Sequence, residues 1–263
     1  KYNYILVASN NSQNGIPWEQ TEYIFNVMAN DINNKINYDK KRVYTCGFSG
    51  GARVASTIAI IKNGIYGVIG CSAGFKEINE FQLKNIIFFG YTGTYDMNYN
   101  EMINLNNILQ KTSIQHDLLI FDGGHQWPQS KNIEDAFIFI YLNEIRSGRT
   151  KNNPEFIQYA EKFYKNNIDS ALKNNNYILA YNYYNSLINN LKYIINTDKY
   201  DNEKNKLSTS QEFIKQSKTI NDIQIQEQNL QQKYIQAFSD KNNIWWQNEV
   251  KKLALDTINK NTP

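Results

Sequence analysis

The stretch YTCGFSGGARVAS, residues 44 to 56, passes from β-branched and aromatic residues through a cluster of glycines into small apolar residues. The apolar run that ends at Cys46 predicts a buried strand, and the spacing of the apolar residues after Gly51 predicts a buried helix. Ser49 lies in the tight turn between them, in the spacing Gly-x-Ser-x-Gly. Such a turn favours a nucleophile elbow, in which glycines allow strand and helix to approach closely and the serine hydroxyl is held at the turn.

The same alternation of apolar and amphipathic segments extends over the first 146 residues. It predicts a parallel sheet covered by helices on both faces, that is, an α/β fold. The expected strands are 4–8, 43–46, 66–70, 86–90 and 117–121, and the expected helices are 19–36, 51–61, 100–111 and 133–145.

The pattern changes after residue 147. The segment 148–154 combines turn-forming residues with charge and is interpreted as a linker between an α/β domain, 1–147, and an all-helical domain, 155–263. Helices are expected near 154–173, 177–196, 209–218, 222–239 and 242–258. Part of the second helix resembles a tetratricopeptide helix, but no second copy follows at that period, so we expect a helical bundle or an atypical helical repeat.

Composition narrows the function. Apolar residues make up 41% of the 263 residues, enough for sizeable cores, and no run is long enough for a membrane span. The net charge of +3 is spread along the chain, which argues against nucleic acid as a partner. The two cysteines, Cys46 and Cys71, are expected to be buried free thiols rather than a disulfide. No metal-ligand spacing or phosphate-binding loop is present, so no metal or cofactor is expected.

A serine hydroxyl is a weak nucleophile that needs a base and an orienting carboxylate. Of the two histidines, His125 follows the strand 117–121, at the edge where the functional loops of an open α/β sheet lie, whereas His116 precedes that strand. Asp96 is the carboxylate in the loop after strand 86–90. The order Ser49, Asp96, His125 is that of nucleophile, acid and base in α/β hydrolases.

These residues carry a resemblance to the α/β-hydrolase superfamily, closest to serine esterases related to polyhydroxybutyrate depolymerase and feruloyl or acetyl-xylan esterases. The segment Gly123–Pro128, GGHQWP, is similar to the string that family members carry around the catalytic histidine, and the segment around Asn14 and Trp18 adds to the likeness. The resemblance covers a little over half of the chain and implies an α/β-hydrolase sheet.

It also implies an activity: hydrolysis of carboxylic esters through an acyl-enzyme on Ser49, with His125 as base, Asp96 orienting it and the Gly50 N–H as one oxyanion donor. Acyl groups on polysaccharides or small polyesters are the implied substrates. Trp18, Tyr95 and Trp127 are candidates for lining the substrate site.

Three residues precede the expected strand at Tyr4, whereas the resemblance implies an earlier strand that supplies the second oxyanion donor. We therefore expect that an N-terminal part of the hydrolase sheet is missing from the sequence or comes from another chain.

Export, to the periplasm, cell surface or medium, is favoured over the cytoplasm because relatives are often exported. Two alternatives remain open: a non-catalytic binding or scaffold protein whose helical domain engages a protein partner, and a prolyl-oligopeptidase-type peptidase.

Overall fold

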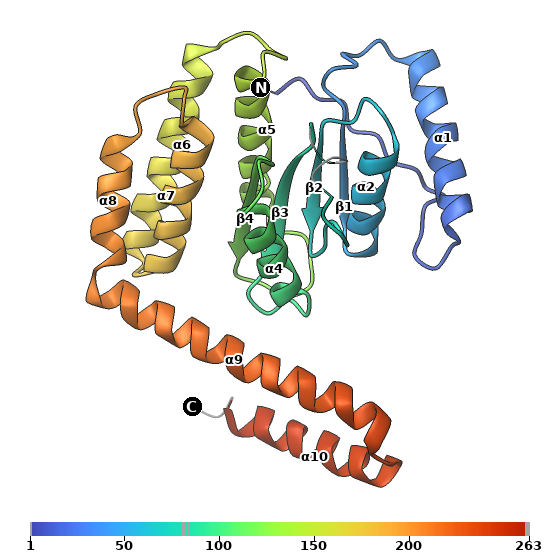
Figure 1. The fold of residues 1–263 in the computed structure, drawn as a ribbon, viewed down its shortest axis with the longest axis vertical. Coiled ribbons are helices and arrows are strands. Elements are labelled where there is room, and N and C mark those ends of the chain that lie inside the picture. Colours follow the sequence, from blue (N-terminus) through green and yellow to red (C-terminus); the bar gives the residue numbers. More distant parts are fainter. Residues whose placement is uncertain (1, 80–82, 84, 261–263) are drawn as a thin grey trace. The chain divides into compact units, whose positions relative to one another are not determined.

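The computed structural model describes residues 2–79, 83 and 85–260. Its contacts divide the chain into two compact units, 1–210 and 211–263. Elements are labelled as in Figure 1.

The first unit is built on four parallel strands that lie side by side in chain order: β1 (Tyr44–Phe48), β2 (Gly67–Cys71), β3 (Ile87–Gly93) and β4 (His116–Phe121). Phe48 pairs with Cys71 and Cys71 with Tyr91, so the carboxyl ends of neighbouring strands lie level at one edge of the sheet. Loops that leave these ends are therefore brought together. The strands expected at 43–46, 66–70, 86–90 and 117–121 are confirmed.

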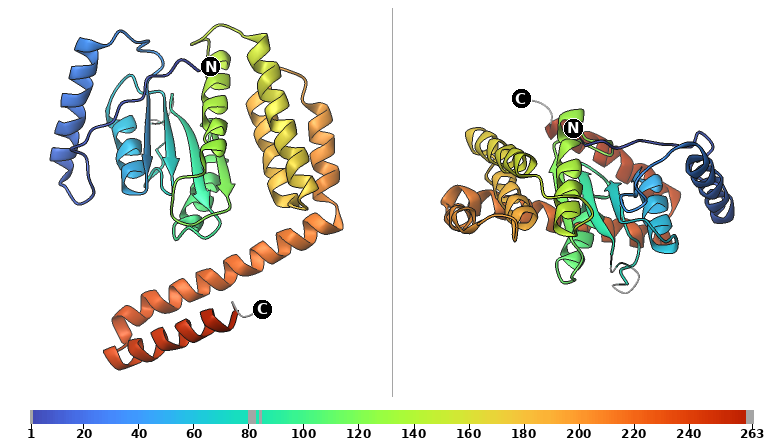
Figure 2. Two further views of the ribbon diagram at one scale, coloured as in Figure 1. Left: turned by 180° about the vertical axis from the view of Figure 1, so that it is seen from behind. Right: turned by 90° about the horizontal axis from the view of Figure 1, so that it is seen from above.

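Alternate residues of the strands feed two cores, one on each face of the sheet. Val68 and Phe88 belong to the core beneath α2 (Gly50–Ile61) and α4 (Tyr99–Leu109). Their neighbours Ile69 and Phe89 belong to the core beneath α5 (Glu134–Arg146). This period of two places helices on both faces, as Figure 2 shows from behind and from above, and confirms the expected α/β class.

Two further helical elements belong to this part of the chain. Helix α1 (Trp18–Lys35) packs only loosely, since Thr21 is its one buried residue. A 3₁₀ turn, η1 (Ser130–Asn132), precedes α5.

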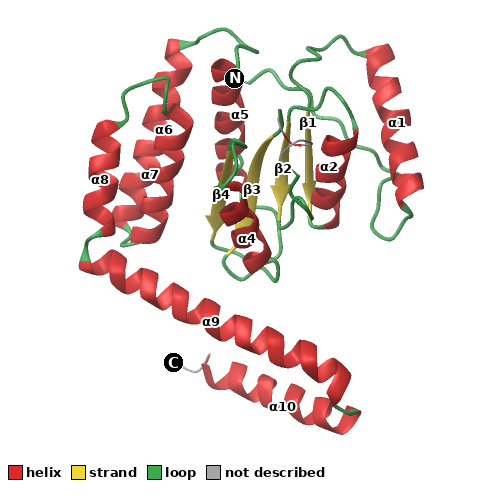
Figure 3. Ribbon diagram, viewed as in Figure 1, coloured by secondary structure: helices red, strands yellow, loops and turns green. Residues whose placement is uncertain are grey.

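The strand expected at 4–8 is wrong. Figure 3 shows coil from the N-terminus to α1, and Ile5, Leu6 and Val7 expose their side chains. Tyrosine hydroxyls hold the segment instead: Tyr2 donates to Glu134 and Tyr4 to Glu144. These two contacts hold the segment against α5, and the Tyr4 ring also packs on Tyr44 at the start of β1, with centroids 6.1 Å apart, without pairing as a strand.

The helices after residue 153 divide between the two units. α6 (Pro154–Lys173), α7 (Tyr177–Leu191) and α8 (Asp198–Ser208) belong to the first unit. Tyr164 of α6 and Leu187 of α7 lie in the same core as Phe89 of the sheet. The division therefore falls after Ser210 and differs from the boundary expected at 148–154, because α6 and α7 complete the core on the α5 face.

The second unit is a helical hairpin of α9 (Gln211–Asp240) and α10 (Asn243–Lys260). Trp246 packs on Tyr234 and on Phe238, with ring centroids 6.0 and 4.8 Å apart, and Glu249 pairs with Lys233. α9 is one helix where two were expected, at 209–218 and 222–239, and α8 was not expected at all. Among the residues that the structure describes, no helix is long and apolar enough to cross a membrane.

Candidate active site

Ser49 occupies a strained turn between β1 and α2. Its backbone has φ 52° and ψ −119°, a conformation that residues other than glycine seldom adopt. The Ser49 N–H donates to the carbonyl of Cys71 (2.8 Å), and the Ser49 carbonyl accepts from Ala52 and Arg53 at the start of α2. The turn is therefore fixed from both sides, as in a nucleophile elbow.

Glycines make this turn possible. A side chain at Gly47 would lie 2.2 Å from the carbonyl oxygen of Gly51, so β1 and α2 could not approach as they do. A side chain at Gly50 would come within 2.4 Å of Asn14 Oδ1, which places the Asn14 amide beside the residue that follows Ser49.

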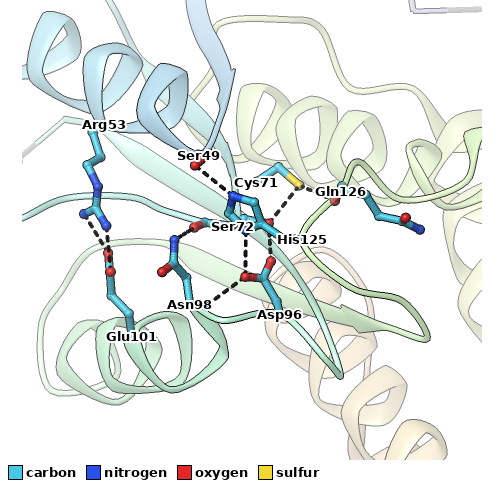
Figure 4. Close-up of polar contacts among 9 residues, drawn as sticks. All are labelled: Ser49, Arg53, Cys71, Ser72, Asp96, Asn98, Glu101, His125 and Gln126. Carbon is cyan, nitrogen blue, oxygen red and sulfur yellow. Dashed lines mark hydrogen bonds and ion pairs between the residues drawn. The ribbon is translucent and has the colours of Figure 1, made fainter. Parts of the chain in front are cut away.

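A chain of hydrogen bonds joins the three residues that the sequence singled out (Figure 4). His125 Nε2 lies 2.9 Å from Ser49 Oγ, and His125 Nδ1 lies 2.8 Å from Asp96 Oδ1. Their loops follow β1, β3 and β4, at the level carboxyl ends of the strands. The structure therefore brings Ser49, Asp96 and His125 together, whereas His116 opens β4 at the opposite end.

Asp96 is buried, with 2% of its surface exposed, and both of its carboxylate oxygens accept hydrogen bonds. Oδ1 accepts from the Asn98 N–H (2.8 Å) in addition to His125, and Oδ2 accepts from the hydroxyl of Ser72. A buried carboxylate paired in this way favours the Nδ1–H tautomer of His125 and leaves Nε2 free to accept from the Ser49 hydroxyl.

Ser72 and Asn98 were missed from the sequence. Ser72 follows β2 directly, at the same edge of the sheet as Ser49, Asp96 and His125. That position was the one indication in the sequence that Ser72 belongs to the site. It is a weak indication, because a serine after a strand is also typical of an ordinary turn.

The remaining predicted residues lie at different distances from this centre. The Phe48 ring is 4.8 Å from the His125 ring and 5.9 Å from that of Trp127, so Trp127 borders the histidine through Phe48. Tyr95, next to Asp96, is 80% exposed. Trp18 is instead half-buried against the core beneath α2.

Arg53 forms a two-pronged ion pair with Glu101 of α4, at 2.7 Å for each contact. The guanidinium group thus ties the elbow helix to α4, and Figure 4 shows it turned away from His125.

The two cysteines differ. Both are free; Cys71 is buried as expected, whereas the expected burial of Cys46 is wrong. Cys46 is exposed on β1, the strand at the edge of the four. Burial raises the pKa of the Cys71 thiol to about 12, a shift that the Ser72 hydroxyl partly opposes and the Asp96 charge reinforces. Cys71 is therefore an uncharged thiol beside the site rather than a rival nucleophile.

Among the described residues, no group of three or more histidine, cysteine or carboxylate side chains could hold a metal ion.

The fold and the site define a class: an α/β protein whose serine elbow, aspartate and histidine follow successive parallel strands, in the chain order of α/β hydrolases. A scan against models of protein families found no match, and neither did a search of curated proteins.

Solved structures similar to this chain include three hydrolases. S-formylglutathione hydrolase (FrmB) from Staphylococcus aureus is 15% identical, over 49% of this chain and 66% of that protein, with a TM-score of 0.38. FphF, a fluorophosphonate-binding serine hydrolase from the same organism, is 16% identical over 45% and 62%, with a TM-score of 0.37. A carboxylesterase from Bacillus cereus is 19% identical over 51% and 71%, with a TM-score of 0.38. The chain covers less than two thirds of the first two proteins, and likenesses at such TM-scores carry no weight for the activity.

Proposed function

We propose that the protein is a serine hydrolase that cleaves carboxylic esters through an acyl-enzyme on Ser49. The observation that carries this proposal is the hydrogen-bonded series from Ser49 Oγ through His125 to Asp96, with contacts of 2.9 and 2.8 Å, at a strained turn. A serine on such a turn, with a base in hydrogen-bond reach and a carboxylate behind the base, has the parts that nucleophilic catalysis requires.

In the first half of the reaction, Ser49 Oγ bonds to the ester carbonyl carbon while His125 Nε2 takes the hydroxyl proton. The carbonyl oxygen becomes an oxyanion, for which the Gly50 N–H is one donor. The bond to the alcohol oxygen then breaks, and His125 gives its proton to the leaving alcohol. In the second half, water gives a proton to His125 and adds to the acyl carbon, and the acid departs as Ser49 regains its proton.

The roles of His125 and Asp96 follow from their surroundings. The buried Asp96 carboxylate accepts a hydrogen bond at Nδ1, where it orients the imidazole and stabilises the imidazolium that forms in each half-reaction. The Asn14 side chain lies against Gly50 with its amide oxygen, an acceptor, nearest, so the Gly50 N–H is the one oxyanion donor that we propose.

For the substrate we propose acyl esters on sugars or small polyesters. Two large aromatic side chains, Tyr95 and Trp127, flank Asp96 and His125 in the chain and are exposed. Flat apolar faces of sugar rings and short polyester units pack well on such side chains. Hydrolysis of acetylated xylan and of a soluble hydroxybutyrate oligomer, compared with p-nitrophenyl acetate, tests this choice.

The first experiment is labelling by a fluorophosphonate probe, followed by intact-mass measurement and peptide mapping. We expect one adduct on Ser49 and none in Ser49→Ala. His125→Gln is expected to slow labelling by about 10³-fold or more, because the base is lost.

The chain offers a matched control in its other histidine. His116 lies at the amino end of β4, with Nδ1 2.8 Å from the carbonyl of Ile114, so His116→Gln is expected to label at the wild-type rate. A wild-type protein that gains no adduct, or that is labelled equally in Ser49→Ala, would contradict the proposal and favour a binding or scaffold role.

A further inference from the structure

Ser72 is held in a conformation that the sequence alone would not favour. It is fully buried directly after β2, and its backbone has φ 60°. The Ser72 N–H donates to the carbonyl of Tyr91 (2.8 Å), and its own carbonyl accepts from Asn98 Nδ2 (2.8 Å). A non-glycine residue in the left-handed region is strained, so its surroundings must hold it there.

This conformation aims the Ser72 hydroxyl at Asp96. Ser72 Oγ donates to Oδ2, while Oδ1 accepts from His125 Nδ1 and from the Asn98 N–H, each at 2.8 Å. Within the part of the chain that the structure describes, Ser72 is the one donor to Oδ2. A carboxylate held at both oxygens cannot rotate about its Cβ–Cγ bond, so the direction in which Oδ1 meets the imidazole is fixed.

Asn98 links the two ends of this arrangement. Its backbone N–H binds Asp96 Oδ1 and its side-chain amide binds the Ser72 carbonyl, so one residue positions both the carboxylate and the serine that holds it. Figure 4 shows Ser72, Asn98 and His125 gathered around Asp96.

We propose that Ser72 is a positioning residue of the active site, which fixes the Asp96 carboxylate through Oδ2 so that His125 stays aligned with Ser49. This inference rests on the proposed esterase function. Ser72 does not touch the substrate and acts only through Asp96. Its loss therefore affects the steps in which the imidazole gains and loses a proton, and not the binding of the ester.

The test is Ser72→Ala, which removes the hydroxyl that donates to Asp96 Oδ2. We expect kcat for an aryl ester to fall about tenfold, because misaligned catalytic groups lose rate, while KM changes by less than about twofold. The matched control is Ser56→Ala in α2, another buried serine, whose hydroxyl has no hydrogen-bond partner among the described residues. Ser56→Ala is expected to keep both constants.

Alanine at φ 60° is itself strained, so Ser72→Gly is measured alongside; glycine accepts this backbone and also lacks the hydroxyl. Both variants should show the same loss of kcat. Wild-type kcat in either folded variant would overturn the proposal, as would a change in KM of the same size as that in kcat.

A measurement without substrate separates this proposal from the proposed function. The proton shared by His125 Nδ1 and Asp96 gives a downfield ¹H NMR resonance when it is protected, and His116 serves as an internal reference. In Ser72→Ala we expect that resonance to move or to vanish by exchange with water, and in Ser56→Ala to stay. An unchanged resonance in Ser72→Ala overturns the positioning role even if Ser49 is labelled, whereas an unlabelled Ser49 together with a changed resonance would contradict only the esterase.

Discussion

At the scale of single residues, the glycines of the elbow differ in whether the packing around them leaves room for a side chain. A Cβ at Gly47 would lie 2.2 Å from Gly51 O and 2.6 Å from Ala52 N, both backbone atoms of the packed helix, whereas a Cβ at Gly51 would meet nothing within 4 Å. The close approach of β1 and α2 therefore depends on Gly47 alone of this pair.

Gly47→Ala is expected to lower the free energy of unfolding by more than about 2 kcal/mol, because backbone atoms cannot move aside. Gly51→Ala, the matched control in the first turn of α2, is expected to change it by less than about 1 kcal/mol, towards greater stability. Urea unfolding of the two variants gives both values. Equal losses would mean that glycine is needed at 47 for a reason other than this contact.

The same scale shows which site residues a sequence can reveal. Ser49, Asp96 and His125 were predictable because each follows a strand and their chemical types are complementary. Ser72 was not, because its role depends on a positive φ and on a hydroxyl aimed at Asp96, which exist only once β2 and β3 pair.

At the scale of elements, the first turn of α5 inserts a carboxylate into the core between the sheet and α6. Asp135 is buried, and its pKa is raised well above the ordinary value by burial and then by the nearby charge of Asp117. Burial also raises the pKa of Asp117 on β4. This carboxylate, however, accepts hydrogen bonds from Ser186, Asn190 and the Leu118 N–H, which oppose the increase in its pKa.

These raised pKa values set a pH dependence of stability. The folded protein keeps protons that the unfolded chain releases above about pH 4, so the free energy of unfolding falls as pH rises from there through the raised folded-state pKa of Asp135. Asp135→Asn is expected to flatten this slope and to stabilise the protein at pH 7 by on the order of 1 kcal/mol.

Asp117→Asn is the contrasting variant, because it loses an acceptor for Asn190 Nδ2 and should destabilise the protein at the same pH. Urea unfolding from pH 5 to 8 measures both variants. A wild-type slope in Asp135→Asn would show that the buried carboxylate does not cause the pH dependence.

Elements were predictable where a run of apolar residues reflects burial on both sides, as in β2, β3 and α5. The strand expected at 4–8 failed because an apolar run becomes a strand only when it pairs with another, and tyrosine contacts fix this segment against α5 instead. Helix α8 was not predictable from the sequence, because Tyr200 is its one buried residue and its other residues show no helical spacing of apolar side chains.

At the scale of the whole molecule, the chain contains two compact units whose cores differ greatly in size. The first unit packs the sheet and α6 and α7 around shared apolar residues, whereas in the hairpin α9 has one buried residue, Ala237. A domain with its own core can fold by itself, so the unit ending at Ser210 should not need the hairpin for its stability.

Two truncations distinguish the contact-based division from the boundary expected at 148–154. A chain cut after Ser210 should keep the thermal transition of the first unit and the labelling of Ser49. A chain cut after Ser147 exposes the surface that Tyr164 and Leu187 cover, and it should aggregate or unfold at a lower temperature and lose labelling, because the α5 face of the core is left open. Differential scanning calorimetry with fluorophosphonate labelling measures both outcomes. If the shorter chain were as stable and as reactive as the longer one, α6 and α7 would be accessories to the sheet rather than part of its core.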